Sequence, residues 1–195
     1  MAKVRLRPKY SPEQLKEVYS TQYDHTRWVD HVARINQTVD FVIDNIYGPE
    51  NFIYSITDLS CGDAAIAKGI AEYIADQFPI SNPELILGDF VSGYDYQGVI
   101  EDTIHEISNT DLFVLSETLE HLDNPEYVLS QIRKKTSYLV LSTPCNETLG
   151  NPEHYWKWGT SDIALMLEET GFTPTAFRYL EFPELDVRYQ MWFAK

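Results

Sequence analysis

The sequence predicts an α/β fold, in which helices flank a sheet that is parallel except for an antiparallel last strand. Short apolar runs typical of buried strands alternate with amphipathic helical segments between residues 52 and 172. This alternation is typical of parallel strands joined by right-handed crossovers. Two strand-like runs, residues 173–182 and 187–194, then follow with only a short connection containing Pro183 between them. Strands joined so closely pair as an antiparallel hairpin.

A helical extension, assigned to residues 1–49, precedes the sheet. The segment SPEQ at residues 11–14 has the pattern of a helix start, with serine as the N-cap, proline in the first turn and glutamine three residues after the serine. A longer helix is predicted over residues 27–47, because apolar residues recur there at helical spacing and Gly48-Pro49 follows.

Residues 50–195 form the α/β domain, and no internal repeat or linker divides the chain. Strands before the hairpin are predicted at residues 52–59, 84–88, 97–100, 111–115 and 138–142, with the pattern at 97–100 the weakest. Helices are predicted at residues 64–78, 124–132 and 160–170, and Gly171 closes the last one. A polar, aromatic and irregular loop is expected at residues 143–159.

Hydropathy, cysteine spacing and net charge disfavour a membrane protein, a secreted protein and a duplex-binding protein. No run approaches the ~18 apolar residues of a membrane span, and no apolar segment of a signal peptide follows the basic N-terminus. Cys61 and Cys145 fit no disulfide or zinc spacing, so we expect a cytoplasmic protein with no membrane partner. The net charge of −15 disfavours duplex nucleic acid as a partner. The basic residues between positions 3 and 9 are expected to form a solvated end, with contact to an anionic partner as the alternative.

The stretch DLSCGDA at residues 58–64 lies where the first strand of the sheet turns into a helix. Ligands of an open parallel sheet bind beyond the carboxyl ends of its strands. A dinucleotide fingerprint would place glycines at positions 60, 62 and 65, but only Gly62 is present, so a NAD site is disfavoured. The carboxylate of Asp58 is suited instead to the amino group of a ligand with an amino-acid moiety.

Two residues at the end of the next strand indicate further groups of the expected ligand. Asp89 can accept hydrogen bonds from both hydroxyls of a ribose, and Phe90 offers a flat face to an adenine. An amino acid, a ribose and an adenine together describe S-adenosylmethionine.

The motif DLSCGDA resembles the first motif of class I S-adenosylmethionine-dependent methyltransferases, usually written D-x-G-x-G-x-G, with Ser60 and Ala64 at two of its glycine positions. The segments DLFVLSETLEHLDNPEYVL, YLVLSTPCNE and TSDIALMLEETGF are similar to the fourth strand with its helix, the fifth strand and the last helix of these enzymes. The resemblance covers residues 50–195 and implies a Rossmann-like, seven-stranded sheet.

The resemblance also implies an enzyme that transfers the methyl group of S-adenosylmethionine. Where the family has an acidic residue near the adenine this chain has Val99, and we assign the contact to Glu101, with Asp102 as the alternative. The extension 1–49 is expected to lie over the site on the acceptor side. Arg27 within it either pairs with the methionine carboxylate or is a surface cation. The expected cofactor-binding residues are Asp58, Ser60, Cys61, Gly62, Asp89, Phe90, Glu101, Ser116 and Arg27.

A cluster of carboxylates and imidazoles follows the predicted strand at 111–115. Glu117, Glu120 and His121 have the spacing of one helical face, and the fold brings the loop with His154 over the same pocket. Two carboxylates and two imidazoles suit Mg²⁺, Mn²⁺ or Zn²⁺. Without a metal, His121 or His154 is a candidate general base, and Glu117 is the third candidate catalytic residue.

The segments ETLEH (117–121) and HYWKWGT (154–160) resemble two methyltransferase groups. One group O-methylates catechol-type rings in ubiquinone biosynthesis. The other modifies small-RNA 3′ ends at the 2′-oxygen and uses these four positions as metal ligands, whereas many relatives carry the pattern without a known metal. The aromatic residues Tyr155, Trp156 and Trp158 either line an acceptor pocket, stack an unpaired base or pack the loop onto the sheet.

We therefore expect a methyltransferase that acts on a small-molecule acceptor, at an oxygen atom. RNA 3′-terminal 2′-O-methylation is an alternative that the cluster favours and the acidic charge opposes. A non-catalytic S-adenosylmethionine-binding module is a second alternative, motivated by the missing glycines at positions 60 and 64. An unrelated nucleotide-binding α/β protein is a third.

Overall fold

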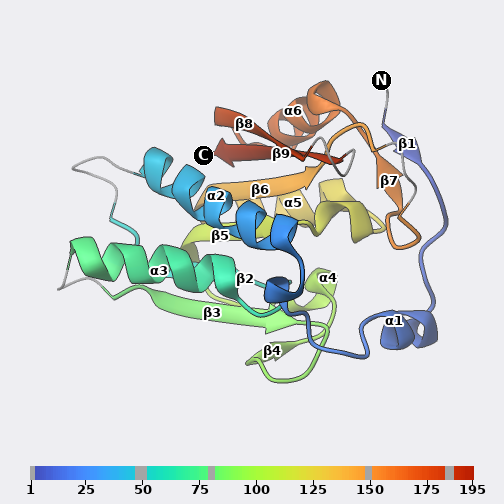
Figure 1. Cartoon of the computed structure of the whole chain (residues 1–195), viewed down its shortest axis with the longest axis horizontal. Coiled ribbons are helices and arrows are strands. Elements are labelled where there is room, and N and C mark those ends of the chain that lie inside the picture. The colour runs from blue at the N-terminus through green and yellow to red at the C-terminus, as the bar shows by residue number, and fades with distance from the viewer. Residues whose placement is uncertain (1–2, 47–51, 79–81, 148–150, 183–186) are drawn as a thin grey trace.

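A seven-stranded sheet forms the centre of the molecule (Figure 1). The computed structural model describes residues 3–46, 52–78, 82–147, 151–182 and 187–195. Neighbouring strands from β4 to β6 are parallel, whereas β9 pairs antiparallel with both β6 and β8. The predicted fold class is therefore confirmed. In spatial order the strands are β4 (Tyr96–Gln97), β3 (Glu84–Asp89), β2 (Ser55–Asp58), β5 (Thr110–Ser116), β6 (Thr136–Pro144), β9 (Val187–Ala194) and β8 (Pro174–Phe182).

Helices cover both faces of this sheet, with α2 and α3 on one face and α4, α5 and α6 on the other (Figure 1). Within the described ranges, no helix is both long and apolar enough to cross a membrane. The helices are α1 (Pro12–Val18), α2 (Val29–Ile46), α3 (Ala65–Gln77), α4 (Ile100–Thr103), α5 (Pro125–Arg133) and α6 (Thr160–Glu169), with the 3-10 turns η1 (His25–Arg27) and η2 (Leu119–His121).

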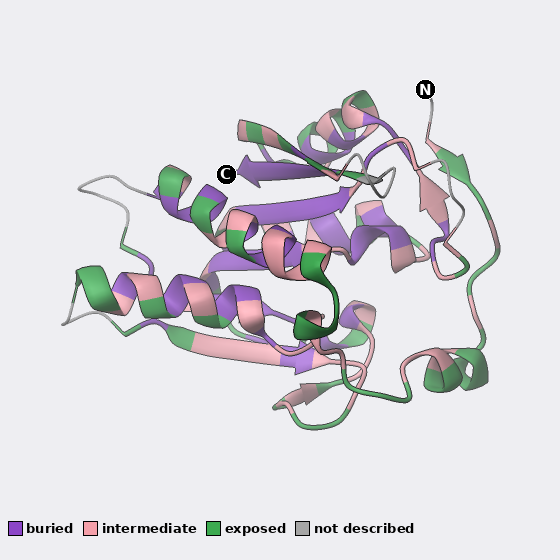
Figure 2. Cartoon of the chain, viewed as in Figure 1, coloured by how far each residue is buried: buried purple, intermediate pink, exposed green. Residues whose placement is uncertain are grey.

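Side-chain alternation along β5 builds the two apolar layers. Leu112 and Val114 pack in the cluster under α2 and α3, whereas Phe113 and Leu115 pack in the cluster under α4, α5 and α6. All four side chains are completely buried, and Figure 2 shows the central strands mainly in the colour of buried residues. Burial of each such side chain stabilises the fold by about 1.5–3 kcal/mol. The end of β5 is thus rigidly held, and the residues after it belong to the site described below.

Two predicted elements differ from the structure. Trp28 has extended backbone after η1, so the long helix begins at Val29 rather than at residue 27. The weak strand predicted at 97–100 is reduced to β4, because Gly98 turns the chain with a φ of +148° and Ile100 already begins α4. The predicted helix end at Gly48-Pro49 and the connection with Pro183 lie outside the described residues.

The predicted loop at 143–159 contains a short strand that pairs with the N-terminal segment. This strand, β7 (Trp156–Lys157), lies antiparallel to β1 (Val4–Arg5) in a two-stranded sheet. The basic end is therefore solvated as expected, since none of its described side chains is buried, but it is paired with β7 rather than free. Lys3 forms an ion pair with Glu126, and Arg5 forms one with Asp123.

Candidate active site

A cavity of about 760 Å³ lies at the carboxyl ends of the central parallel strands. Its floor comes from the ends of β2, β3, β5 and β6, and the extension that contains α1 and the start of α2 closes it from the other side. Figure 1 shows how this extension passes across that end of the sheet. The cavity has the position expected for a ligand site in an open α/β sheet.

The turn after β2 is built for close contact between backbone and ligand. Gly62 has a φ of +57°, and a Cβ atom at this position would lie 2.7 Å from Cδ1 of Tyr23. Asp89 accepts a hydrogen bond of 2.8 Å from the Gly62 N–H, and Asp58 accepts one of 3.1 Å from the Ser60 N–H. Ala64, at the third glycine position of the motif, also has a left-handed φ of 63°. The turn therefore keeps the backbone of a glycine-rich loop although alanine carries a modest strain there.

Asp58 and Asp89, the two carboxylates bonded to this turn, lie in an environment that disfavours their charged form. Asp58 is 3% exposed, and burial, reinforced by nearby Asp89, raises the pKa of its carboxyl to about 8. Burial likewise raises the pKa of Asp89, although backbone N–H groups donate to this carboxylate. A positively charged group on a ligand would relieve this cost at Asp58.

The predicted cofactor residues lie together on the cavity wall, with one exception. Phe90 packs against Tyr19 with the ring centroids 5.8 Å apart and the ring planes tilted by 55°, and both rings line the cavity, where they can contact a flat group. Burial raises the pKa of the Cys61 thiol, which therefore stays protonated. The cavity-lining members of the predicted set are Asp58, Ser60, Cys61, Gly62, Asp89, Phe90, Glu101 and Ser116.

The exception is Arg27, which is exposed, pairs with Asp24 at 3.5 Å and does not line the cavity. The arginine at the cavity is Arg34, which is only 6% exposed. Its guanidinium donates to Ser116 Oγ at 2.8 Å and to the Tyr23 hydroxyl at 3.3 Å. Within the described ranges, no carboxylate lies within salt-bridge distance of Arg34. Burial acts to lower the pKa of Arg34, but nearby Glu117 outweighs it, so the pKa is raised. A buried guanidinium without a direct ion pair is still costly, so Arg34 is suited to an anionic group of a ligand.

Arg34 belongs to no motif and is therefore not among the residues predicted from the sequence. A signal was nevertheless present: Arg34 precedes Thr38 by four residues and Phe41 by seven, so a cation lies on the buried face of an amphipathic helix.

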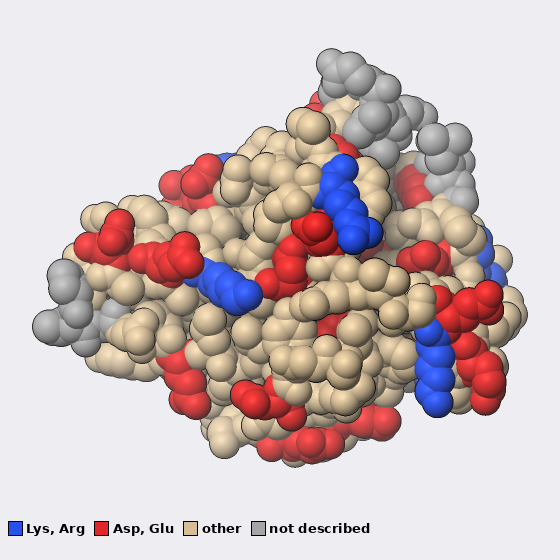
Figure 3. Space-filling view, turned by 60° about the horizontal axis from the view of Figure 1, so that its bottom comes forward, with Lys and Arg blue, Asp and Glu red and all other residues tan. Residues whose placement is uncertain are grey.

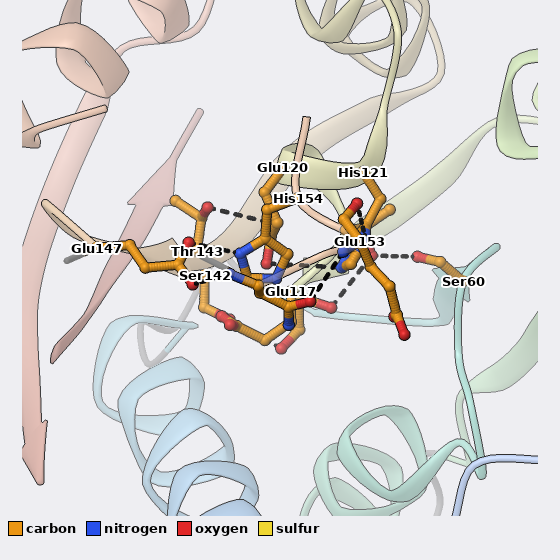
Figure 4. Close-up of polar contacts among 12 residues, drawn as sticks. Ser60, Glu117, Glu120, His121, Ser142, Thr143, Glu147, Glu153 and His154 are labelled. Atoms are coloured by element: carbon orange, nitrogen blue, oxygen red, sulfur yellow. Dashed lines mark hydrogen bonds and ion pairs between the residues drawn. The ribbon is translucent and has the colours of Figure 1, made fainter. Parts of the chain in front are cut away.

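Three of the four predicted cluster residues converge on one point (Figure 4). Within the described ranges, Glu120, His121 and His154 each direct one oxygen or nitrogen atom so that these atoms lie within 4.8 Å of one another. His121 Nε2 is 4.0 Å from Glu120 Oε1, and the two imidazole rings lie 4.9 Å apart. Glu120 Oε1 is buried and has no hydrogen-bond partner.

The other polar atoms of these three side chains are already engaged. His121 Nδ1 donates to the Glu153 carbonyl at 3.1 Å, and His154 Nδ1 donates to Glu147 at 2.6 Å. Glu120 Oε2 accepts from Thr143 at 3.0 Å. Each histidine therefore presents the lone pair of Nε2 toward the centre, which is how metal-binding histidines are oriented by their outer partners. Glu120, His121 and His154 thus fit a divalent cation.

The three residues of the cluster have pKa values shifted in different directions. Burial is the main cause that lowers the pKa of His121 to about 3, and nearby His154 lowers it further. Burial, followed by nearby Glu117, raises the pKa of Glu120 to about 8. At His154 burial acts to lower the pKa, but the hydrogen bond to Glu147 and the surrounding carboxylates outweigh it, so the pKa is raised.

Glu117 lies near this group but is not among the three residues whose ligand atoms converge. Its φ is +51°, and the 3-10 turn η2 includes only residues 119–121. The expectation that Glu117, Glu120 and His121 share one helical face is therefore wrong for Glu117. Its Oε1 accepts from Ser142 at 2.9 Å, and Ser142 in turn lies 2.8 Å from Ser116. Glu117 still lines the cavity.

The aromatic residues of the loop are structural. Trp158 is buried and donates to Thr143 at 3.0 Å, and Tyr155 is buried with its hydroxyl accepting from the Tyr10 N–H at 2.9 Å. Trp156 donates to the Leu122 carbonyl at 2.8 Å. Of the three interpretations of these rings, packing of the loop holds for Trp156 and Trp158, which belong to or pack against an apolar cluster of the core, whereas Tyr155 also lines the cavity.

Comparison with known proteins identifies solved structures that share this fold. No protein-family model matches the sequence, and a sequence search of curated proteins gives no match. Among solved structures, the chain is similar to 1,6-didemethyltoxoflavin-N1-methyltransferase from Burkholderia thailandensis with bound 1,6-didemethyltoxoflavin and S-adenosylhomocysteine. The TM-score is 0.71 and the identity 14%, over 98% of this chain and 93% of that one.

Two further structures agree. Magnesium protoporphyrin IX methyltransferase from Synechocystis, with bound S-adenosylhomocysteine, gives a TM-score of 0.56 at 14% identity over 93% of this chain and 92% of that one. An S-adenosylmethionine-dependent methyltransferase from Leishmania major gives 0.56 at 14% identity, over 86% and 74%. The protein therefore has the fold of class I S-adenosylmethionine-dependent methyltransferases.

Proposed function

We propose that the protein is an S-adenosylmethionine-dependent methyltransferase that methylates an oxygen atom of a small-molecule acceptor. One observation carries this proposal. A single cavity joins the turn around Gly62 and Asp89 to the cluster of Glu120, His121 and His154. A cofactor bound at the turn and an acceptor bound at the cluster would share this space, as direct methyl transfer requires.

The residues at the turn fit S-adenosylmethionine, which when bound supplies an electrophilic methyl group on its sulfonium. Asp58 is placed to accept from the ammonium group and Asp89 from the ribose hydroxyls. Arg34 has free donors for the carboxylate, and Phe90 with Tyr19 bounds a space for the adenine. The carboxylate contact is thus proposed for Arg34 in place of Arg27.

The cluster supplies groups that can activate the acceptor oxygen. His121, with its pKa near 3, is neutral at physiological pH and is a better ligand than base. Without a metal, His154, whose Nδ1 is hydrogen-bonded to Glu147, is the better candidate base, because the carboxylate stabilises the protonated imidazole. With a metal, the same Nε2 is a ligand instead. Glu120, His121 and His154 would hold a divalent cation. With two imidazoles among the ligands, Zn²⁺ or Mn²⁺ suits the site better than Mg²⁺, and the cation would lower the pKa of an acceptor hydroxyl.

A small acceptor is favoured over RNA by the charge of the site. The acceptor end of the cavity carries Glu147, Glu153 and Glu181 in addition to the cluster. Carboxylates also dominate the molecular face in Figure 3, where few lysine and arginine side chains appear. A mobility shift with single-stranded RNA at low salt distinguishes the two acceptors, because an RNA enzyme must bind under those conditions.

Calorimetric titration of S-adenosylhomocysteine into dialysed protein, with and without chelator, tests the proposal. We expect binding in both conditions, together with a divalent metal that the chelator removes. Absence of binding in both would refute the proposed function. Binding without transfer to any offered acceptor would instead support a non-catalytic module.

A further inference from the structure

The N-terminal segment 4–10, called here the strap, is fastened along the segment that carries His154. Beyond the pairing of β1 with β7, the Leu6 N–H donates to the Tyr155 carbonyl at 2.7 Å. The Tyr10 N–H donates to the Tyr155 hydroxyl, and the two rings meet edge to face with centroids 5.6 Å apart. The Arg7 guanidinium and the Tyr10 hydroxyl both donate to the Pro152 carbonyl. The strap therefore contacts residues on both sides of His154.

The opposite edge of the same segment is bound to the cluster. The Tyr155 N–H donates to the Glu120 carbonyl at 2.7 Å, and the Glu153 carbonyl accepts from His121 at 3.1 Å. The backbone around His154 is thus the middle element of a small ladder. The strap forms one outer edge, and the residues of η2 form the other.

We propose that the strap is a positioning element that holds His154 within reach of Glu120 and His121. This inference rests on the proposed function, in which these three residues act together. Among the described residues, no hydrogen bond, ion pair or ring contact joins Leu6, Arg7 or Tyr10 to the cofactor turn or the cluster, so they act through residues 152–155. A metal site or catalytic cluster assembled from two distant segments needs such support, because ligand geometry set by outer contacts strongly affects affinity.

The strap can be loosened without unfolding the domain. None of its side chains is buried, so it lies outside both apolar clusters. The ion pairs that accompany it are largely exposed, and such pairs contribute at most about 1 kcal/mol each. Segments held by few contacts open locally at low free energy. Weakening the strap should therefore affect His154 before it affects the sheet.

A proline substitution tests this inference with a matched control. Leu6→Pro removes the N–H that donates to Tyr155, whereas Leu6→Ala keeps the N–H and shortens only an exposed side chain. Amide hydrogen exchange at Tyr155, measured by NMR, should be at least about tenfold faster in Leu6→Pro than in the wild type and unchanged in Leu6→Ala. Amides of β5 serve as the reference for global stability.

Binding measurements then separate positioning from folding. Mn²⁺, titrated alone and followed by the EPR signal of the free ion, should bind Leu6→Pro at least about tenfold more weakly than the wild type. Affinity for S-adenosylhomocysteine should stay within about twofold, because the hydrogen bond removed from Leu6 is made to Tyr155 and not to the cofactor turn. Tyr10→Phe, which loses the bond to Pro152 but keeps its ring, should show a smaller change in the same direction.

If the Tyr155 amide exchanges equally slowly in Leu6→Pro and Leu6→Ala, the proposal that the strap positions His154 is wrong. Unchanged Mn²⁺ affinity in Leu6→Pro, when the wild type binds the ion, would overturn it as well. If the wild type itself takes up no Mn²⁺, the metal part of the proposed function fails, and the exchange experiment alone decides the positioning role.

Discussion

Replacing Asp58 by asparagine should stabilise the protein without ligand and weaken its binding of the cofactor. In the folded state the pKa of Asp58 is about 8, against a reference value of 3.8. At pH 7 the folded protein therefore keeps a proton that the unfolded chain has lost. The gap of about three units between pH 7 and 3.8 corresponds to at most about 4 kcal/mol of lost stability. Asparagine avoids this cost and retains an oxygen for the Ser60 N–H.

The sign of the pH dependence follows from the raised pKa. The destabilising contribution of Asp58 should be absent below pH 4, and the free energy of unfolding of the wild type should decline as the pH rises toward 8. Asp58→Asn should lack this decline, so the difference between the two proteins should grow from pH 4 to pH 8. Urea unfolding at several pH values measures it. Asp40→Asn is the control, since Asp40 is exposed on α2.

Cofactor binding should show the opposite trend. The ammonium group of S-adenosylhomocysteine requires ionised Asp58, so wild-type affinity should increase between pH 6 and pH 8. Asp58→Asn should bind about tenfold to a hundredfold more weakly, because a hydrogen bond between charged groups is lost. A variant that is less stable than the wild type at pH 7 without ligand would refute the reasoning about burial. Unchanged cofactor affinity would refute the assigned contact.

Three other changes test the remaining parts of the site. Arg34→Met should weaken S-adenosylhomocysteine about tenfold to a hundredfold by calorimetry, but 5′-methylthioadenosine, which lacks the carboxylate, by less than about threefold. His154→Ala should abolish Mn²⁺ binding in the EPR titration and leave S-adenosylhomocysteine affinity within about threefold. Gly62→Ala should lower the free energy of unfolding by about 1–3 kcal/mol in urea, because its φ is +57° and its Cβ would meet Tyr23 at 2.7 Å.

Specific outcomes would count against each of these expectations. Equal losses of both ligands in Arg34→Met would mean that the guanidinium supports the fold of the pocket rather than the carboxylate. Full Mn²⁺ affinity in His154→Ala would remove this residue from the cation site. Wild-type stability in Gly62→Ala would show that the turn and Tyr23 adapt to a side chain at this position.

Elements with a local signal could be predicted from the sequence. The N-cap at Ser11 and the capping box with Gln14 are present as expected, and Asn124 caps α5. The strands β5 and β6 carry uninterrupted apolar runs, and their order fixes where the cofactor turn lies relative to the cluster. These features depend on neighbouring residues, which a sequence displays directly.

Features that depend on distant residues could not be predicted in this way. β1 and β7 contain two residues each, and a pairing over 150 positions of sequence leaves no periodic pattern in either segment. The departure of Glu117 from the helical face arises from its left-handed backbone and from Ser142, which comes from a different strand. Spacing and the expected position of the loop with His154 suggested four cluster residues, whereas the ligand atoms of three converge in the structure.

The position of β9 has a consequence for how the protein is made. β9 lies between β6 and β8, both of which precede it in sequence, so neither strand completes its pairing until residues 187–194 have left the ribosome. Until then β6 presents an open edge, and Met191 and Trp192 are missing from the two apolar clusters. Open strand edges promote association between chains. Nascent chains should therefore depend on chaperones until late in translation, and a product truncated before β9 should aggregate rather than retain partial activity.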